Sequence, residues 1–207
     1  MARARSSPSE SGARRGARSA LRFPAELKRQ AAAHGVVPRL VAESPEEWRL
    51  GPATVVVDRR RGTAQIRYAR EPLARARCDA EEVLRGWRRA LDRLASESLA
   101  PDPFLNALSE AYAQLLANSG RPPGERVPLG ELIPAVARAS GRRSYSRAQF
   151  AWDIARLRVE RRLHHDGRRV MLDVATGPAA SQKRRAVWIE DASGAGQYYG
   201  SFRLVAR

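Results

Sequence analysis

Arginines recur along residues 144–164, a stretch whose apolar residues have the period of a helix. At 100° per residue, three of them share one flank with the small Ala151, namely Arg147, Arg158 and Arg162. A guanidinium group is always charged and its planar fork matches phosphate oxygens, and a small residue lets a backbone approach the helix closely. This flank therefore predicts contact with the phosphate backbone of a nucleic acid.

The same stretch has the signals of a buried helix. Ser146 and Gln149 have the spacing of a capping box, which predicts Ser146 as the N-cap. The apolar residues form two arcs on opposite sides of the helix: Phe150, Ile154 and Leu157 in one, and Ala148, Trp152, Ala155, Val159 and Leu163 in the other. We expect such a helix to be packed on both sides within a small domain.

Residues suited to catalysis are few. The histidines are His34, His164 and His165. The adjacent pair lies at a predicted helix end, which favours interaction with the helix dipole over metal binding. Cys78 is the only cysteine, so no intrachain disulfide can form. Three acids near the predicted C-terminal strands lack the lysine of a nuclease site: Asp173, Glu190 and Asp191. We expect a non-enzymatic protein without metal or cofactor.

The positive charge is unevenly distributed. The 207 residues carry a formal net charge of +16, and 43% of them are hydrophobic, as in an ordinary globular protein. Residues 138–185 alone contribute +9, whereas residues 99–137 and 186–207 together contribute −2. The preference for arginine over lysine is typical of a GC-rich coding sequence, but it does not explain this clustering. The cluster favours nucleic-acid binding over two alternatives, a solvated basic face and a patch for an acidic protein partner.

The first hundred residues predict a small α+β module behind a basic tail. Residues 1–20 lack periodic apolar residues, which predicts disorder. A short helix over 25–33, a second helix starting at 44–47, and a hairpin of strands 54–58 and 63–69 are expected in the module, residues 21–98. Asp79 caps a further helix, and the stretch 96–103 is the expected boundary. No apolar run is long enough to span a membrane, so we expect a soluble, cytoplasmic protein.

The remaining residues, 102–207, predict three helices followed by strands. The expected helices cover residues 102–116, 128–140 and 144–164. Strands 169–174 and 186–190 are expected to form a hairpin around the loop 175–185, and residues 196–205 to add another strand.

This order resembles a winged helix-turn-helix domain over residues 102–191. The resemblance rests on Leu129-x-x-Leu132, Ser146-Arg147-x-x-Phe150-x-x-Asp153-Ile154-x-x-Leu157 and Gly167-x-x-Val170-x-Leu172. It implies an α+β fold with a C-terminal winged helix, whose third helix enters the major groove and whose wing contacts the DNA backbone or minor groove. The DNA contacts that it implies are Arg142, Arg143, Ser144, Tyr145, Arg147, Arg158, Arg162, Lys183, Arg184 and Arg185.

The sequence therefore predicts a protein that binds duplex DNA through helix 144–164 and the loop 175–185, as a regulator or as a DNA-targeting subunit of a larger complex. In that case it would be associated with the nucleoid. One alternative is a winged helix that serves as a protein-interaction or scaffold subunit. Another is a basic RNA-binding protein, although the sequence lacks an aromatic-rich RNA motif. Self-association as a homodimer stays open.

Overall fold

The protein has a mixed α+β fold with two antiparallel sheets. The computed structural model describes residues 22–177, 186–191 and 195–206. They divide into two compact units, one containing the described residues up to Tyr68 and Pro72–Asp92, the other containing Ala69–Glu71 and the described residues from Arg93 onward. The predicted disordered tail, residues 1–20, and the basic end of the loop 175–185 lie outside the described residues.

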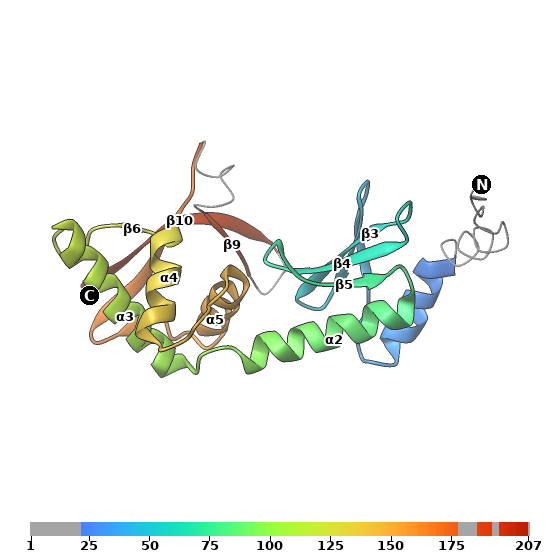
Figure 1. The fold of residues 1–207 in the computed structure, drawn as a ribbon, viewed down its shortest axis with the longest axis horizontal. Helices are drawn as coiled ribbons and strands as arrows, with labels where there is room; N and C mark the ends of the chain where they lie inside the picture. Colours follow the sequence, from blue (N-terminus) through green and yellow to red (C-terminus); the bar gives the residue numbers. More distant parts are fainter. Residues whose placement is uncertain (1–21, 178–185, 192–194, 207) are drawn as a thin grey trace, which may run out of the picture. The chain divides into compact units, whose positions relative to one another are not determined.

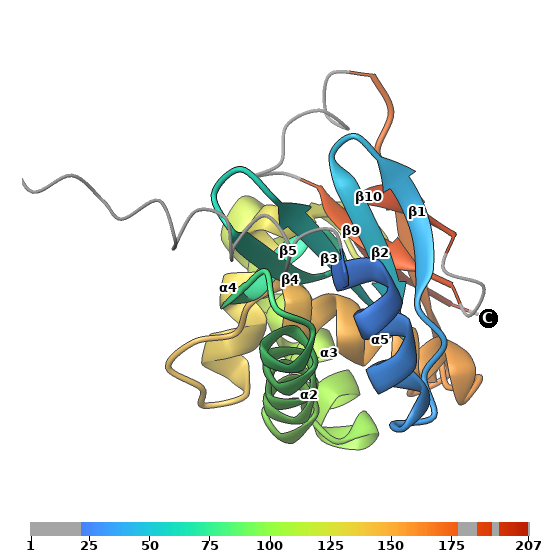
Figure 2. The same ribbon diagram turned by 90° about the vertical axis from the view of Figure 1, so that its right-hand side faces the viewer.

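A five-stranded meander forms the sheet of the first unit. Its strands follow one another in sequence order (Figures 1 and 2): β1 Arg39–Glu43, β2 Glu46–Leu50, β3 Ala53–Asp58, β4 Thr63–Tyr68 and β5 Glu71–Arg77. A helix over residues 22–32 precedes the meander, and α2, Ala80–Ser96, follows it. The amide N–H of Glu82 donates to Asp79 Oδ1 at 3.1 Å, which confirms the predicted cap of α2.

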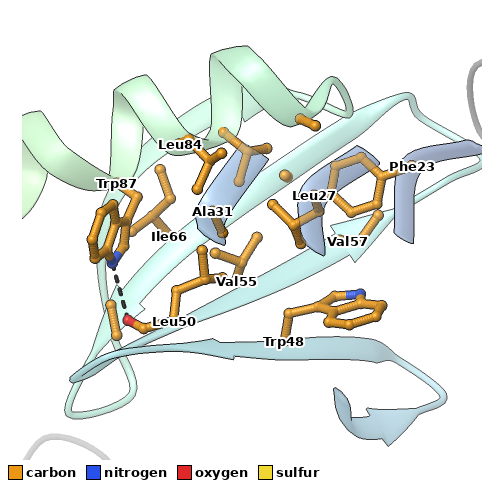
Figure 3. Packing of buried hydrophobic residues seen from close by; sticks show 14 of the residues in the cluster. Phe23, Leu27, Ala31, Trp48, Leu50, Val55, Val57, Ile66, Leu84 and Trp87 are labelled. Atoms are coloured by element: carbon orange, nitrogen blue, oxygen red, sulfur yellow. Dashed lines mark hydrogen bonds between the residues drawn. The ribbon is translucent and has the colours of Figure 1, made fainter. Parts of the chain in front are cut away.

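Alternate residues of β2, β3 and β4 form the core of this unit together with the two helices. Leu50, Val55 and Ile66 are completely buried, and they lie among apolar side chains of helix 22–32 and α2 (Figure 3). The indole Nε1 of Trp87 on α2 donates to the carbonyl oxygen of Leu50 at 3.0 Å. This bond ties α2 to the end of β2 and satisfies both buried polar groups.

One prediction for this unit needs correction, and two of its strands were not expected. The helix predicted to start at residues 44–47 is wrong, because Glu46–Leu50 form strand β2. Trp48 and Leu50 are buried while Arg49 between them is half-buried, so the strand period of two overrides the local helix-start signal. The sequence analysis did not predict strands β1 and β5. The predicted strands 54–58 and 63–69 are confirmed as β3 and β4.

The second unit contains three helices and a second sheet. Its elements are α3 Pro101–Ser119, β6 Val127–Pro128, α4 Leu129–Ala139, α5 Arg147–Val159, β7 His164–His165, β8 Arg168–Val174, β9 Val187–Glu190 and β10 Gly196–Ala206. The sheet runs β6-β10-β8-β7, and β9 also pairs with β10. Helix α4 packs against β10 and α5 against β9 (Figure 1).

The strand pairing differs from the hairpin that the sequence predicts. In the described residues, strands β8 and β9 do not pair with each other. Each of them pairs with β10 instead. The first four residues of β10 pair with β9, and Tyr199 and Ser201–Ala206 pair with β8 after a register shift between Tyr199 and Ser201. Gly196 opens β10 where a Cβ would lie only 2.8 Å from the Ile189 carbonyl oxygen, so glycine is required there.

Helix α5 begins as predicted but ends early. The Gln149 N–H donates to Ser146 Oγ at 3.1 Å and the Ser146 N–H to Gln149 Oε1 at 2.6 Å, which confirms the capping box. The predicted end at residue 164 is wrong, because α5 ends at Val159. Arg161 has a left-handed φ of 56°, and the following residues join the sheet as β7. The left-handed conformation of Arg161 prevents the helix from continuing, and His164, which was predicted to be the last helical residue, lies in a strand instead.

Candidate nucleic-acid interface

The arginines of the predicted DNA-facing flank have partners within the second unit. Arg147 Nε lies 3.3 Å from Glu71 Oε1, and the Arg158 guanidinium lies 4.9 Å from the centre of the Tyr199 ring. Arg162 forms an ion pair and a hydrogen bond with Asp102. Ala151, expected on the open surface of this flank, is 1% exposed. This flank is therefore less open than expected, because Ala151 is buried and the three arginines are half-buried against partners in the unit.

The predicted contact residues before α5 fall into two groups. The guanidinium of Arg142 donates to the carbonyl oxygens of Glu97 and Ser98, and Tyr145 is 7% exposed. Arg143 and Ser144 are exposed, and within the described ranges neither makes a side-chain hydrogen bond or ion pair. Lys183, Arg184 and Arg185 lie outside the described residues.

Asp153 joins α5 to the turn before it and to the segment before α3 by buried hydrogen bonds. Its carboxylate is completely buried and accepts hydrogen bonds from the Tyr145 hydroxyl at 2.5 Å and the Leu99 N–H at 3.2 Å. Burial raises the pKa of Asp153, against the lowering effect of the Tyr145 and Leu99 hydrogen bonds and the charges of Arg156 and Arg142. Burial, followed by the Asp153 charge, raises the pKa of Tyr145 well above its ordinary value, so its hydroxyl remains a donor.

The apolar arcs of α5 are only half confirmed. Phe150, Ile154 and Leu157 are completely buried, as expected for the first arc. In the second arc Ala148 is buried, but Val159 is 73% exposed and Trp152 is only half-buried. The helix is therefore packed mainly on the side of the first arc and of Ala151, and its last residue, Val159, is exposed.

Strands β8 and β10 place a different set of arginines on the surface. Side chains of Val170, Phe202 and Leu204 point into the core and are buried. The alternate residues on the other side pair across the two strands as Arg169 with Val205, Met171 with Arg203, and Asp173 with Ser201. Arg169 is exposed and the other five are half-buried. We call these six residues, together with Arg126, the open face.

The open face carries more positive than negative charge. Arg126 directly precedes β6, whose Val127 pairs with Phe202 of β10, so the chain places Arg126 beside Arg203. Asp173 Oδ2 lies 3.3 Å from Arg126 Nε, and Asp173 Oδ1 accepts a hydrogen bond from Arg203 Nη2 at 3.3 Å. Arg169 makes no ion pair among the described residues. The open face as defined thus has three guanidinium groups and one carboxylate.

The hairpin of β7 and β8 extends this positive charge. His164 pairs with Arg169 and His165 with Arg168 across the two strands. Arg161 and Arg168 are exposed, and neither has an ion pair within the described ranges. The acid of the hairpin, Asp166, interacts with His165 Nε2 at 3.2 Å. Clustered exposed guanidinium groups of this kind can bind phosphate oxygens by charge-assisted hydrogen bonds.

The sequence interpretation missed the three arginines of the open face, Arg126, Arg169 and Arg203, and also Arg161 and Arg168 of the hairpin. Every second residue along 169–173 and 201–205 is apolar, and most of the residues between them are polar. This alternation could have indicated that each strand has one face turned away from the core. What alternation could not indicate is that β8 pairs with β10, because the expected partner of residues 169–174 was the nearer strand 186–190. The arginines come together only through that long-range pairing.

The part of the chain that the structure describes gives no sign of a metal site or a membrane segment. Within it, no group of three or more His, Cys, Asp or Glu side chains could hold a metal ion. None of its helices combines the length and apolar composition needed to cross a bilayer. Comparison of the chain with protein families, curated proteins and solved structures found no match.

Proposed function

We propose that this protein binds duplex DNA through the phosphate backbone, and that the open face and the β7–β8 hairpin make the contact. The observation that carries the proposal is the row of Arg126, Arg203 and Arg169 on the open face, which as defined contains one carboxylate, that of Asp173. A rigid sheet fixes the spacing of the arginine backbones, and their planar guanidinium groups match phosphate oxygens, which suits a ligand whose charges repeat regularly. Phosphate contacts alone give binding that does not depend on base sequence.

The order of elements supports a winged-helix arrangement for the second unit. Three helices precede the strands, and β6 pairs with β10, which in turn pairs with β8. In winged helices the third helix usually enters the major groove. We do not assign that role to α5, because Arg147, Arg158 and Arg162 have partners inside the unit. Fold alone does not determine where a domain binds.

Duplex DNA fits the open face better than a single strand does. Proteins that bind single strands stack successive bases on aromatic rings, and the open face as defined contains none. Trp188 and Tyr198, on β9 and β10, pack against each other with ring centres 5.0 Å apart at 70°. The described arginines therefore suit a continuous backbone more than unstacked bases.

A salt titration tests the proposal. Duplex affinity should fall steeply with salt, and Arg169→Ala should reduce the slope of log affinity against log salt by about 0.9. Arg29→Ala is the matched control, because Arg29 is an exposed arginine of the first unit, paired with Glu26. Arg158→Ala separates the two binding modes. If the open face binds, Arg158→Ala should change the slope little; if α5 binds, Arg158→Ala rather than Arg169→Ala should reduce the slope by about 0.9.

Three outcomes would overturn the proposal. The first is wild-type protein that shows no salt-sensitive binding to duplex DNA, which would favour the protein-interaction alternative. The second is tighter binding to single-stranded DNA or RNA than to the duplex. The third is an equal loss of slope in Arg29→Ala and Arg169→Ala, which would indicate attraction by total charge rather than by the open face.

A further inference from the structure

We infer that Asp173 occupies the position on the open face where a DNA phosphate binds, and so limits the affinity of the protein for DNA. This inference rests on the proposed function and names a residue that regulates the same site. It concerns the only acid of the open face, which the structure places between two of its three arginines.

The geometry around Asp173 is that of an occupied anion site. Its Oδ1 accepts from Arg203 Nη2 at 3.3 Å, and its Oδ2 accepts from the Ser201 hydroxyl at 3.3 Å and lies 3.3 Å from Arg126 Nε. Three donors from β10 and from the residue before β6 thus converge on one carboxylate. A phosphate offers the same kind of oxygen acceptors, so these groups are suited to either anion.

The exposure of the three side chains indicates how the two anions compete. The Asp173 side chain is 19% exposed, whereas those of Arg203 and Arg126 are 32% and 62% exposed. The arginines can therefore be reached from solvent while their bonds to Asp173 persist. The Nε of Arg203 is buried and has no hydrogen-bond partner among the described residues, so this guanidinium has unused donor capacity.

Competition has two physical consequences for DNA. The negative charge of Asp173 repels an approaching phosphate, and its ion pairs hold Arg126 and Arg203 away from that phosphate. Neutralising the carboxylate removes both effects, and asparagine keeps an oxygen that can accept the Ser201 bond. The arginines then become free to contact the backbone.

The experiment compares Asp173→Asn with Asp166→Asn in the full chain, using a duplex of fixed length at several salt concentrations. Both changes remove one negative charge from the proposed DNA-binding surface, but Asp166 lies in the turn between β7 and β8, is 80% exposed and contacts His165 rather than arginine. Asp173→Asn should raise affinity roughly tenfold near 0.1 M salt and make the salt slope steeper by about 0.9. Asp166→Asn should give only the general effect of one charge, about twofold.

A double variant identifies the groups responsible. Adding Arg203→Ala to Asp173→Asn should remove most of the gain, because the freed guanidinium is gone. Circular dichroism of each variant checks that the sheet is intact, and Asp173→Ser, which also lacks the charge, provides a second variant if asparagine disturbs it. An equal effect of Asp173→Asn and Asp166→Asn, or weaker binding by Asp173→Asn and Asp173→Ser when both are folded, would overturn the inference. If that happens while Arg169→Ala still lowers the salt slope, the proposed function stands; absence of wild-type DNA binding would instead remove the function.

Discussion

The hydroxyl of Tyr145 donates a hydrogen bond of 2.5 Å to the buried carboxylate of Asp153. Tyr145 lies in the turn before α5 and Asp153 in the second turn of that helix, so the bond fixes the entry of the chain into α5. The same carboxylate accepts the Leu99 N–H at 3.2 Å, which attaches the segment between α2 and α3 to α5. One acid therefore holds three parts of the second unit together.

Removal of this carboxylate should be costly. Asp153→Ala leaves the Tyr145 hydroxyl and the Leu99 N–H buried without an acceptor, and we expect a loss of about 2–4 kcal/mol in the free energy of unfolding. Asp153→Asn keeps an oxygen acceptor and should lose less. Urea unfolding followed by circular dichroism measures both, and equal losses in the two variants would show that the hydrogen bonds are not the cause.

The pH dependence of stability should carry the signature of Asp153. Its pKa in the folded protein is raised from the ordinary value of 3.8, with burial as the largest cause. The folded state therefore holds this proton more tightly than the unfolded state, so the contribution is present below the unfolded pKa and is lost as pH rises through the folded pKa. The advantage of wild type over Asp153→Asn should shrink from about pH 4 to pH 7. Urea unfolding at both pH values tests this, and an advantage that grows with pH would contradict it.

Ser146 of the α5 capping box can be compared with the nearby Ser144, which lies outside the box. Ser146→Ala removes the acceptor of the Gln149 N–H, and we expect a loss of about 1 kcal/mol in stability. Ser144→Ala, two residues earlier, changes an exposed serine without a side-chain hydrogen bond in the described structure and should stay within about 0.5 kcal/mol of wild type. Thermal unfolding compares the two, and similar shifts in Tm would refute a capping role.

The first unit should depend on the bond between Trp87 and Leu50. Trp87→Phe keeps an aromatic ring but leaves the buried Leu50 carbonyl without its donor, so we expect a loss of about 1–3 kcal/mol. Arg89→Ala on the same helix changes an exposed side chain and should have little effect. Urea unfolding of both variants is the measurement, and a Trp87→Phe protein as stable as Arg89→Ala would contradict the prediction.

Local signals predicted much of the fold. The Ser-x-x-Gln pattern located the start of α5, and the helix predicted over residues 102–116 is α3, which continues to Ser119 before Gly120 with its left-handed φ of 65°. The sequence Ser44-Pro45-Glu46-Glu47 misled, because its helix-start pattern competes with the buried alternation of Trp48 and Leu50. Burial in the folded unit decides whether such a segment forms a helix or a strand, and the local sequence alone does not reveal that burial.

The candidate site was harder to predict than the helices. The charge cluster over residues 138–185 contains Arg161, Arg168 and Arg169 of the candidate site but neither Arg126 nor Arg203, and it could not indicate which arginines are used internally. Arg162 pairs with Asp102, sixty residues earlier, and Arg142 binds carbonyl groups of the α2–α3 junction. Arg169 is exposed because it lies on the face of β8 opposite the buried Val170. These outcomes depend on long-range packing, which a helical projection does not represent.

The junction between α2 and α3 also has a consequence for the order of folding. The carbonyl groups of residues 97–99 and the Leu99 N–H bond to side chains 44–57 residues later in the chain. Contacts of that separation require closure of a long loop, which is slower than helix formation. We therefore expect α2 and α3 to form early and the junction between them to become fixed only after α5 has packed, as one of the last steps in folding of the second unit.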